Sequence, residues 1–278
     1  MKKYYSLIAA LLLLSSTSNM QAQVEFVDLG LPSGTLWANM NVGATAEHET
    51  GYYLAWGETE PKADYSWATY KWCDGTQSIM TKYVVDEQYG QVDGKTVLDN
   101  EDDAGVSGEN TGSPTIEEFN ELMDKNICTW TLETINDRKG ARVTGPNGNS
   151  IFLPASGFMT NTRLSTDNSA GCFWTNTLTT TQARYYYNAH VIRVGITRTG
   201  ISIDSRDHNG AGFVPRNYGY NIRPVKRTSG SSGIDNVTAD NSVPVKYYSI
   251  TGVETSSPSK GLNIAVYSDG STKKIIVK

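Results

Sequence analysis

The apolar residues of this chain are spaced for short β-strands over most of its length. Glycine, asparagine, aspartate and proline break the chain into pieces of strand length, of which the clearest are residues 51–56, 139–144, 150–154, 184–194 and 221–225. One segment differs. From Pro114 to Asp124 apolar residues recur at intervals of three and four, and Ser113 or Thr115 can cap the start. The pattern predicts one clear helix in a body with long loops, which we assign to the α+β class.

Both ends of the chain differ from this body. Lys2 and Lys3, followed by the apolar run 6–14, are typical of a secretory signal peptide and predict removal of residues 1–22. No other apolar run approaches membrane length, so we expect no integral membrane segment. Residues 227–240 are rich in glycine and serine and predict a linker. Residues 241–278 contain short strand-like runs and predict a small C-terminal all-β tail.

The charge is distributed unevenly between the body and this tail. The 278-residue chain has a formal charge of −5, which becomes −7 once Lys2 and Lys3 are removed. The tail carries a net charge of +3, which leaves −10 on residues 23–240. Nucleic-acid phosphates require a basic face, so the acidic body indicates that nucleic acid is not a partner.

The body contains a series of motifs that resemble one known family. They include VDLGLPSGTLWA at 27–38, GYYLAWGE at 51–58, YKWCDG at 70–75, VTGPNGNSIFLP at 143–154 and YGYNIRPV at 218–225. In content and order they are similar to the Fib-succ-major paralogous (FISUMP) family. The resemblance implies that residues 23–226 form a C-type-lectin-like domain, related to the formylglycine-generating enzyme type. Members are mostly secreted or surface proteins without an assigned biochemical role.

The tail has a resemblance of its own. Gly233–Val237, Tyr248–Gly252, Lys260–Ile264 and Lys273–Lys278 are similar to the C-terminal sorting domain of type IX secretion substrates. This resemblance implies recognition by the secretion machinery, passage through the outer membrane, and then removal of the tail or its attachment at the cell surface. The alternative is a small β-appendage that packs on the body.

Three cysteines, Cys73, Cys128 and Cys172, allow three pairings or three buried thiols. Cys73 and Cys128 lie in motifs typical of the family, so the resemblance implies a disulfide between them. Formylglycine-generating chemistry would need a second reactive thiol close to Cys172, late in the domain. No cysteine follows Cys172, which argues against that enzymatic activity.

Acidic residues are concentrated between positions 86 and 124, which hold twelve acids and one basic residue, Lys95. Within this segment Asp99, Glu101 and Asp103 place oxygen ligands at alternate positions, an arrangement that suits Ca²⁺. An EF-hand loop is excluded, since its required glycine and glutamate positions hold Ala104 and Asn110. The alternative is a solvated acidic loop in which Asp102 or Asp103 caps a short turn. We expect no other cofactor.

The remaining candidates for ligand binding are aromatic. Flat aromatic faces meet the C–H surfaces of sugars, while asparagine and aspartate bond the hydroxyls. The aromatic residues in or near expected loops are Trp72, Tyr185, Tyr186, Tyr218 and Tyr220. Large aromatic residues are nevertheless often buried, so a structural role is the alternative for each of them.

These features predict a secreted or cell-surface, non-enzymatic binding module that recognises a glycan or a host or matrix protein. A structural surface-coat protein without a small ligand is the second hypothesis. An enzyme on a formylglycine-generating scaffold is the third.

Overall fold

The fold is described from a computed structural model. It covers residues 24–179, 187–198, 200–204, 213–228, 246–249, 252–255, 257–266 and 272–277. The chain divides into two compact units, Met1–Gly233 and Ile234–Lys278, which we call the body and the tail and describe separately.

The described residues are mostly β-structure, so the expected α+β class is wrong. The structure has strands β1 to β17 in several small sheets, against one α-helix, α1, in the described part of the chain. Helix α1 has only eight residues, Ile116–Met123, and cannot form a layer against a sheet. The sheets themselves therefore enclose the apolar core.

Helix α1 lies where its apolar spacing places it, which confirms that prediction. The Thr115 side chain accepts a hydrogen bond from the Glu118 N–H, and the Glu118 carboxylate accepts one from the Thr115 N–H. This reciprocal capping box satisfies two amide groups at the helix start. The helix buries Phe119 and Leu122, and the Phe119 ring meets Trp37 edge to face with ring centroids 5.0 Å apart.

The first sheet brings the two ends of the body together. Its order is β1 (Phe26–Asp28), β2 (Leu36–Ala38), β13 (Val225–Lys226) and β3 (Thr111–Gly112). Each neighbouring pair is antiparallel, and β13 lies between strands from the start and the middle of the sequence. The strand expected at 221–225 is therefore limited to its last residue and Lys226.

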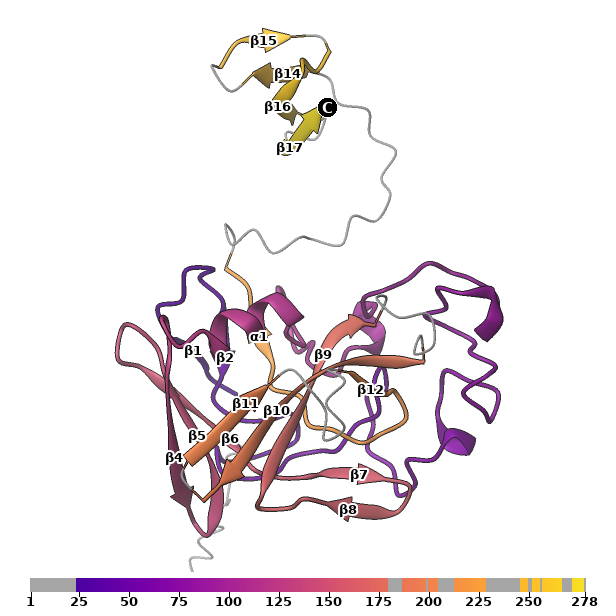
Figure 1. Cartoon of the computed structure of the whole chain (residues 1–278), viewed down its shortest axis with the longest axis vertical. Coiled ribbons are helices and arrows are strands. Elements are labelled where there is room, and N and C mark those ends of the chain that lie inside the picture. Colours follow the sequence, from indigo (N-terminus) through magenta and orange to yellow (C-terminus); the bar gives the residue numbers. More distant parts are fainter. Residues whose placement is uncertain are drawn as a thin grey trace, which may run out of the picture. The chain divides into compact units, whose positions relative to one another are not determined.

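Two further sheets face one another around the main core (Figure 1). One has the order β4 (Thr129–Ile135), β5 (Arg138–Thr144), β6 (Ser150–Pro154). In the other, β10 (Asn188–Thr197) pairs with β9 (Ala170–Leu178), β11 (Gly200–Asp204) and β12 (Phe213–Pro215). Strands β4, β5 and β6 approach β11, β10 and β9 in that order, so β4 and β11 lie beside each other at one side of this pair of sheets.

A buried arginine ties the first sheet to β6. Arg223 is fully buried and donates hydrogen bonds to the carbonyl oxygens of Ala38, at 3.1 Å, and Phe152, at 2.8 Å. Burial lowers its pKa to about 9. Arg223 therefore has a structural role in the body.

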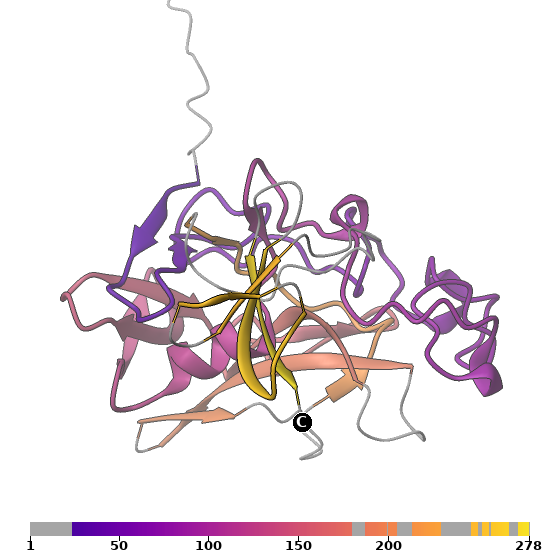
Figure 2. The ribbon, with the colours of Figure 1, turned by 90° about the horizontal axis from the view of Figure 1, so that it is seen from above.

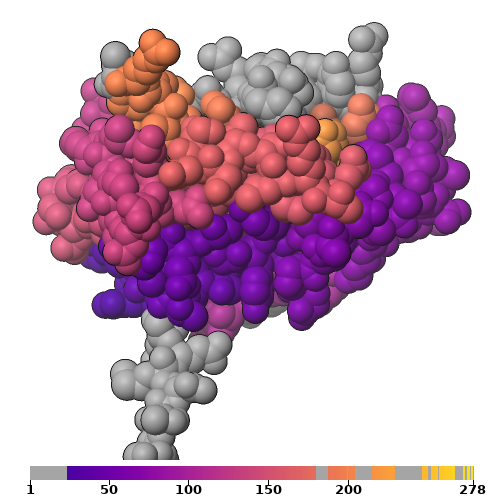
Figure 3. Space-filling view, turned by 90° about the horizontal axis from the view of Figure 1, so that it is seen from below, coloured from indigo at the N-terminus to yellow at the C-terminus, as the bar shows by residue number. Residues whose placement is uncertain are grey.

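Residues Gly57–Asn110 form an irregular lobe, which projects beyond the sheets (Figures 1 and 2, purple). Its described residues contain three short 3-10 helices, η1 (Trp67–Thr69), η2 (Glu87–Tyr89) and η3 (Asn100–Asp102), and no named strand. The lobe has its own apolar cluster, in which Tyr65, Tyr70 and Tyr89 are buried. In the space-filling view the indigo and purple residues, which include this lobe, cover the lower part and the right side of the body (Figure 3). A short hairpin, β7 (Phe158–Thr160) and β8 (Arg163–Ser165), completes the body.

The tail is a four-stranded antiparallel sheet. Its order is β15 (Glu254–Thr255), β14 (Lys246–Ser249), β16 (Gly261–Val266) and β17 (Thr272–Val277). Asn263 on β16 is fully buried, and its amide exchanges hydrogen bonds with Ser259. Strands β14, β16 and β17 match strand-like runs of the sequence to within a few residues at their ends, whereas β15 lies outside those runs.

Candidate ligand-binding surface

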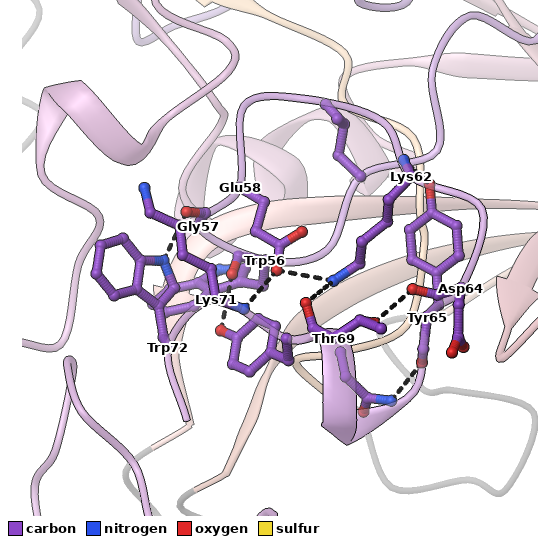
Figure 4. Close-up of polar contacts among 12 residues, drawn as sticks. Trp56, Gly57, Glu58, Lys62, Asp64, Tyr65, Thr69, Lys71 and Trp72 are labelled. Atoms are coloured by element: carbon purple, nitrogen blue, oxygen red, sulfur yellow. Dashed lines mark hydrogen bonds and ion pairs between the residues drawn. The ribbon is translucent and has the colours of Figure 1, made fainter. Parts of the chain in front are cut away.

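The first loop of the lobe, residues 57–72, is held rigid by its own polar contacts (Figure 4). The Glu58 carboxylate accepts hydrogen bonds from Lys62 Nζ and from the Lys71 N–H, both at 2.8 Å. Lys62 Nζ also donates to the Thr69 carbonyl at 2.9 Å. The Trp72 indole N–H donates to the Gly57 carbonyl at 2.6 Å and closes the loop. The loop is therefore preorganised, as a binding surface on a rigid scaffold requires.

Gly57 is the glycine that this closure needs. Its φ is +77°, a conformation that residues with a Cβ adopt at a cost. A Cβ at this position would lie 2.9 Å from the Trp72 Nε1 atom. Both the backbone and the indole therefore require glycine here.

Two lysines lie over the indole ring of Trp72. Lys71 Nζ is 4.1 Å from the ring centroid and Lys82 Nζ is 5.0 Å from it. Tyr83 packs against the same indole edge to face, with centroids 6.1 Å apart. Trp72 is half-buried, whereas the Lys71 side chain is 49% exposed. The structure thus presents an aromatic ring beside an accessible ammonium group, held in place by cation–π attraction.

Asp102 is the acidic centre beneath these lysines. Its side chain is only 2% exposed, and its carboxylate contacts Lys82 Nζ at 2.6 Å, Lys71 Nζ at 3.3 Å and the Tyr83 hydroxyl at 2.7 Å. Burial alone would raise the pKa of Asp102, but these hydrogen bonds outweigh burial and hold it below 3.8. The Tyr83 pKa is raised by burial and by its bond to Asp102. At neutral pH the site therefore holds an ionised carboxylate and two ammonium groups.

The expected calcium ligands are only partly brought together. Asp99, Glu101 and Asp102 have carboxylate oxygens within 4.8 Å of one another, so Asp102 stands where the sequence predicted Asp103. Lys82 Nζ lies 2.6 Å from Asp99, 3.6 Å from Glu101 and 2.6 Å from Asp102. One ammonium group of the chain thus contacts all three carboxylates, and Lys71 and Lys95 supply two further cations at Asp102 and Asp99.

Asp103 belongs to a different network. It is buried, and its carboxylate accepts hydrogen bonds from the Ser113 N–H at 2.8 Å, the Ser113 hydroxyl at 2.5 Å and the Gly105 N–H at 2.8 Å. The local backbone geometry explains why Asp102, and not Asp103, lies beside Asp99. Residues 100–102 form a 3-10 helix, which places positions three apart on one face, so Asp99 and Asp102 align. The alternate spacing that selected Asp103 would apply to an extended strand.

The predicted aromatic ligand residues have different environments. Tyr220 is buried and packs on Trp174, with ring centroids 4.7 Å apart, so its alternative role in the core is the one observed. Tyr218 is half-buried and stacks on Phe158. Trp72 and Tyr218 both pack at the margin of the same apolar cluster. Tyr185 and Tyr186 lie outside the described residues.

Sequence reasoning missed other residues of this surface. Trp67 and Tyr187 are half-buried and meet edge to face with centroids 5.8 Å apart, next to buried Tyr89. Lys71 and Lys82 were also missed. Each directly precedes an aromatic residue in the sequence, and this repeated pair of a lysine and an aromatic residue was the available signal.

The disulfide expected between Cys73 and Cys128 is not formed. All three cysteines lie in the described part of the chain, and none of them is in a disulfide. Cys128 and Cys172 lie in two separate apolar clusters, and Cys73 packs against a third. Burial raises the pKa of the Cys73 thiol and raises that of Cys128 to about 11. These thiols are therefore protonated at neutral pH and are poor nucleophiles.

Comparison of the chain with known protein families, curated proteins and solved structures gave no match. Among the described residues, no helix combines the length and apolar character needed to cross a membrane.

Proposed function

We propose that the protein is a secreted or cell-surface, non-enzymatic binding module that recognises a glycan through the outer side of the 57–72 loop. The observation that carries the proposal is the half-exposed Trp72 with the accessible Lys71 ammonium 4.1 Å from its ring centroid. Trp67 adds a second half-exposed aromatic side chain to the same loop.

Each part of this surface suits a sugar. Indole rings offer apolar area to sugar C–H groups, and the ammonium of Lys71 can donate to hydroxyl or carboxylate oxygens. Because the loop is already fixed by Glu58 and Lys62, little conformational entropy is lost on binding. A rigid loop with a few placed polar groups is the usual construction of a small-ligand site.

A glycan array tests this function directly. The exported chain, residues 23–278, is applied with calcium and again with chelator. We expect saturable binding to a related set of sugars, and the same binding in both buffers, because the ammonium group of Lys82 already occupies the space between the three carboxylates.

Matched variants locate the site. Lys71→Gln removes the accessible ammonium and should weaken binding at least about tenfold, the equivalent of one charge-assisted hydrogen bond. Lys139→Gln changes an exposed lysine on β5 and should bind as the unchanged chain does. A blank array, or equal binding by the Lys71→Gln variant, would contradict the proposal and favour a protein ligand or a coat role.

We further propose that the chain is a member of the FISUMP family, exported by its signal peptide and sorted by its tail. The ordered motifs of the body and of the tail support this assignment. Mass spectrometry of protein from the culture medium or the cell surface tests it. We expect an N-terminus at Gln23, and retention inside the cell envelope when residues 234–278 are deleted.

A further inference from the structure

Strand β4 has one edge that pairs with nothing in the described part of the chain. It is the outer strand of the β4-β5-β6 sheet, and on the side away from β5 its main chain makes no hydrogen bond to the backbone of any residue that the structure describes. Four of its seven residues are exposed: Thr129, Thr131, Leu132 and Thr134. Its register with β5 runs without a bulge from Thr129 to Ile135. This edge is therefore long, regular and accessible.

Three of the other edge strands, β9, β6 and β17, are protected. The main chain of β9 is covered by hydrogen bonds involving Pro114, Thr96 and Asn221. Strand β6 is buried, and its Phe152 carbonyl accepts from Arg223. Strand β17 carries two consecutive lysines, Lys273 and Lys274. Proline, lysine and bulges are among the usual means of preventing edge pairing, and β4 has none of these three.

We propose that β4 pairs with β4 of a second copy of this chain, antiparallel about a two-fold axis at Leu132. The sequence Thr-Trp-Thr-Leu-Glu-Thr-Ile is compatible with this arrangement. Leu132 would face its symmetry mate, and Glu133, the one charged residue of the strand, would lie opposite Thr131. Like charges directly opposite each other destabilise a strand pair, and this register avoids them.

Leu132 also explains why a second copy fits this edge. It pairs with Ala141 in the register of β4 and β5, on the face that carries Trp130 and the main apolar core. Its side chain is nevertheless 44% exposed, because it lies at the outer edge of the sheet. Joining two copies would cover both leucines and continue one apolar face across a six-stranded sheet. A two-fold contact uses the same patch on both copies and closes as a dimer.

The charged face of the strand adds to the complementarity. Arg142 on β5 pairs with Thr131 and contacts Glu133 of its own chain at 2.6 Å. In the two-fold register, Glu133 of the second copy would lie opposite Thr131, in the same cross-strand row as Arg142 and with Thr131 between the two charges. The pairing is independent of glycan binding, since β4 lies outside the lobe.

Sedimentation velocity of the exported chain, from about 1 to 200 µM, tests the proposal. We expect a monomer–dimer equilibrium. Leu132→Lys places two ammonium groups against each other at the axis, and should raise the dimer dissociation constant at least about tenfold. Leu164→Lys makes the same change at a leucine that is 42% exposed on β8, and should leave dimerisation unchanged. Circular dichroism and melting temperature confirm that both variants fold.

A cross-linking variant fixes the register. Leu132→Cys should give a disulfide-linked dimer under mild oxidation, whereas Leu164→Cys should remain monomeric on a non-reducing gel. A monomer across the whole concentration range overturns the proposal. So does a dimer that is equally stable in the Leu132→Lys variant, because it would use another surface.

Discussion

The adjacent residues Asp102 and Asp103 send their carboxylates into two separate hydrogen-bond networks. Asp102 contacts Lys82 at 2.6 Å in the lobe, while Asp103 accepts from Ser113, the residue that follows β3. Asp102 is stabilised as an anion. For Asp103, burial outweighs its hydrogen bonds from Ser113 and Gly105 and raises its pKa above 3.8.

The two residues therefore contribute to stability with opposite dependence on pH. Asp102 binds its proton more weakly in the folded state, so its stabilisation is present above pH 3.8 and is lost as pH falls through its lower folded pKa. Asp103 binds its proton more tightly when folded, so its contribution declines as pH rises from 3.8 through its raised pKa.

Urea unfolding between about pH 3 and pH 7 measures both effects. In Asp102→Asn the free energy of unfolding should rise less with pH than in the unchanged chain. In Asp103→Asn it should rise more. Equal slopes in the two variants would contradict the assignment of opposite shifts.

Removing Lys82 should destabilise the lobe and create a calcium site. Lys82→Gln leaves the buried Asp102 with Lys71 as its remaining cation, which we expect to cost about 2–3 kcal/mol. Calcium should then raise the melting temperature of this variant, because Asp99, Glu101 and Asp102 would offer their oxygens to the ion. Calcium should not affect the unchanged chain.

Lys95→Gln is the control for this substitution. Lys95 is 44% exposed and contacts Asp99 at 2.5 Å at the surface, so its loss should cost below about 1 kcal/mol. Calorimetry with and without calcium measures all three proteins. Stabilisation of the Lys82→Gln variant and the unchanged chain to the same extent would show that Lys82 does not fill the site.

Gly57→Ala should loosen the closure of the 57–72 loop. The new Cβ would add a 2.9 Å contact with Trp72 Nε1 to the strain of a positive φ, and we expect a loss of about 2–4 kcal/mol with altered tryptophan fluorescence. Gly75→Ala has a similar φ of +67° but open space around its Cβ. It should cost only about 1 kcal/mol, from the backbone alone, without a change in fluorescence.

Arg227 should be a large contributor to the stability of the body. Its guanidinium donates to both oxygens of Glu118, at 2.9 and 2.8 Å, and to the Ser113 carbonyl at 3.0 Å. The Glu118 side chain is 8% exposed, so Arg227→Met would leave a buried carboxylate without its cation and should cost about 2–4 kcal/mol.

The neighbouring residue provides the control for Arg227. Lys226 is exposed on β13, and Lys226→Met should change the free energy of unfolding by less than about 0.5 kcal/mol. Chemical denaturation of both variants measures their free energies of unfolding. Equal losses of unfolding free energy in the two variants would mean that the cation at Arg227 is not what stabilises the C-terminal end of the body.

The sequence predicted local structure better than the arrangement of side chains. Helix α1 was found because its spacing and its cap, Thr115, are both local. The sequence grouped Asp103 with Asp99 and Glu101, whereas the structure groups Asp102 with them, because the 3-10 turn that aligns Asp99 with Asp102 has no apolar period to reveal it. The α+β class was wrong because one short helix was counted as a helical layer, whereas the described residues form mainly β-sheets.

In the candidate site, too, the sequence did not show which side chains are buried and which contact one another. Trp72 was selected from its loop position and is half-exposed, whereas Tyr220, chosen on the same ground, is buried against Trp174. Their difference depends on strands brought together from distant parts of the chain. The contact of Lys82 with Asp102 and the separation of Cys73 from Cys128 also depend on how the folded chain packs, which a local pattern in the sequence does not show.

The position of β13 between β2 and β3 determines when the body can finish folding. Val225 pairs with Trp37 and with Gly112, so the sheet that holds the first strands of the body lacks its central member until nearly the whole body is present. Contacts of such long sequence separation form slowly, since a large loop must close first. If the chain crosses a membrane from its N-terminus, the body would thus stay incompletely folded until β13, its own last strand, has crossed.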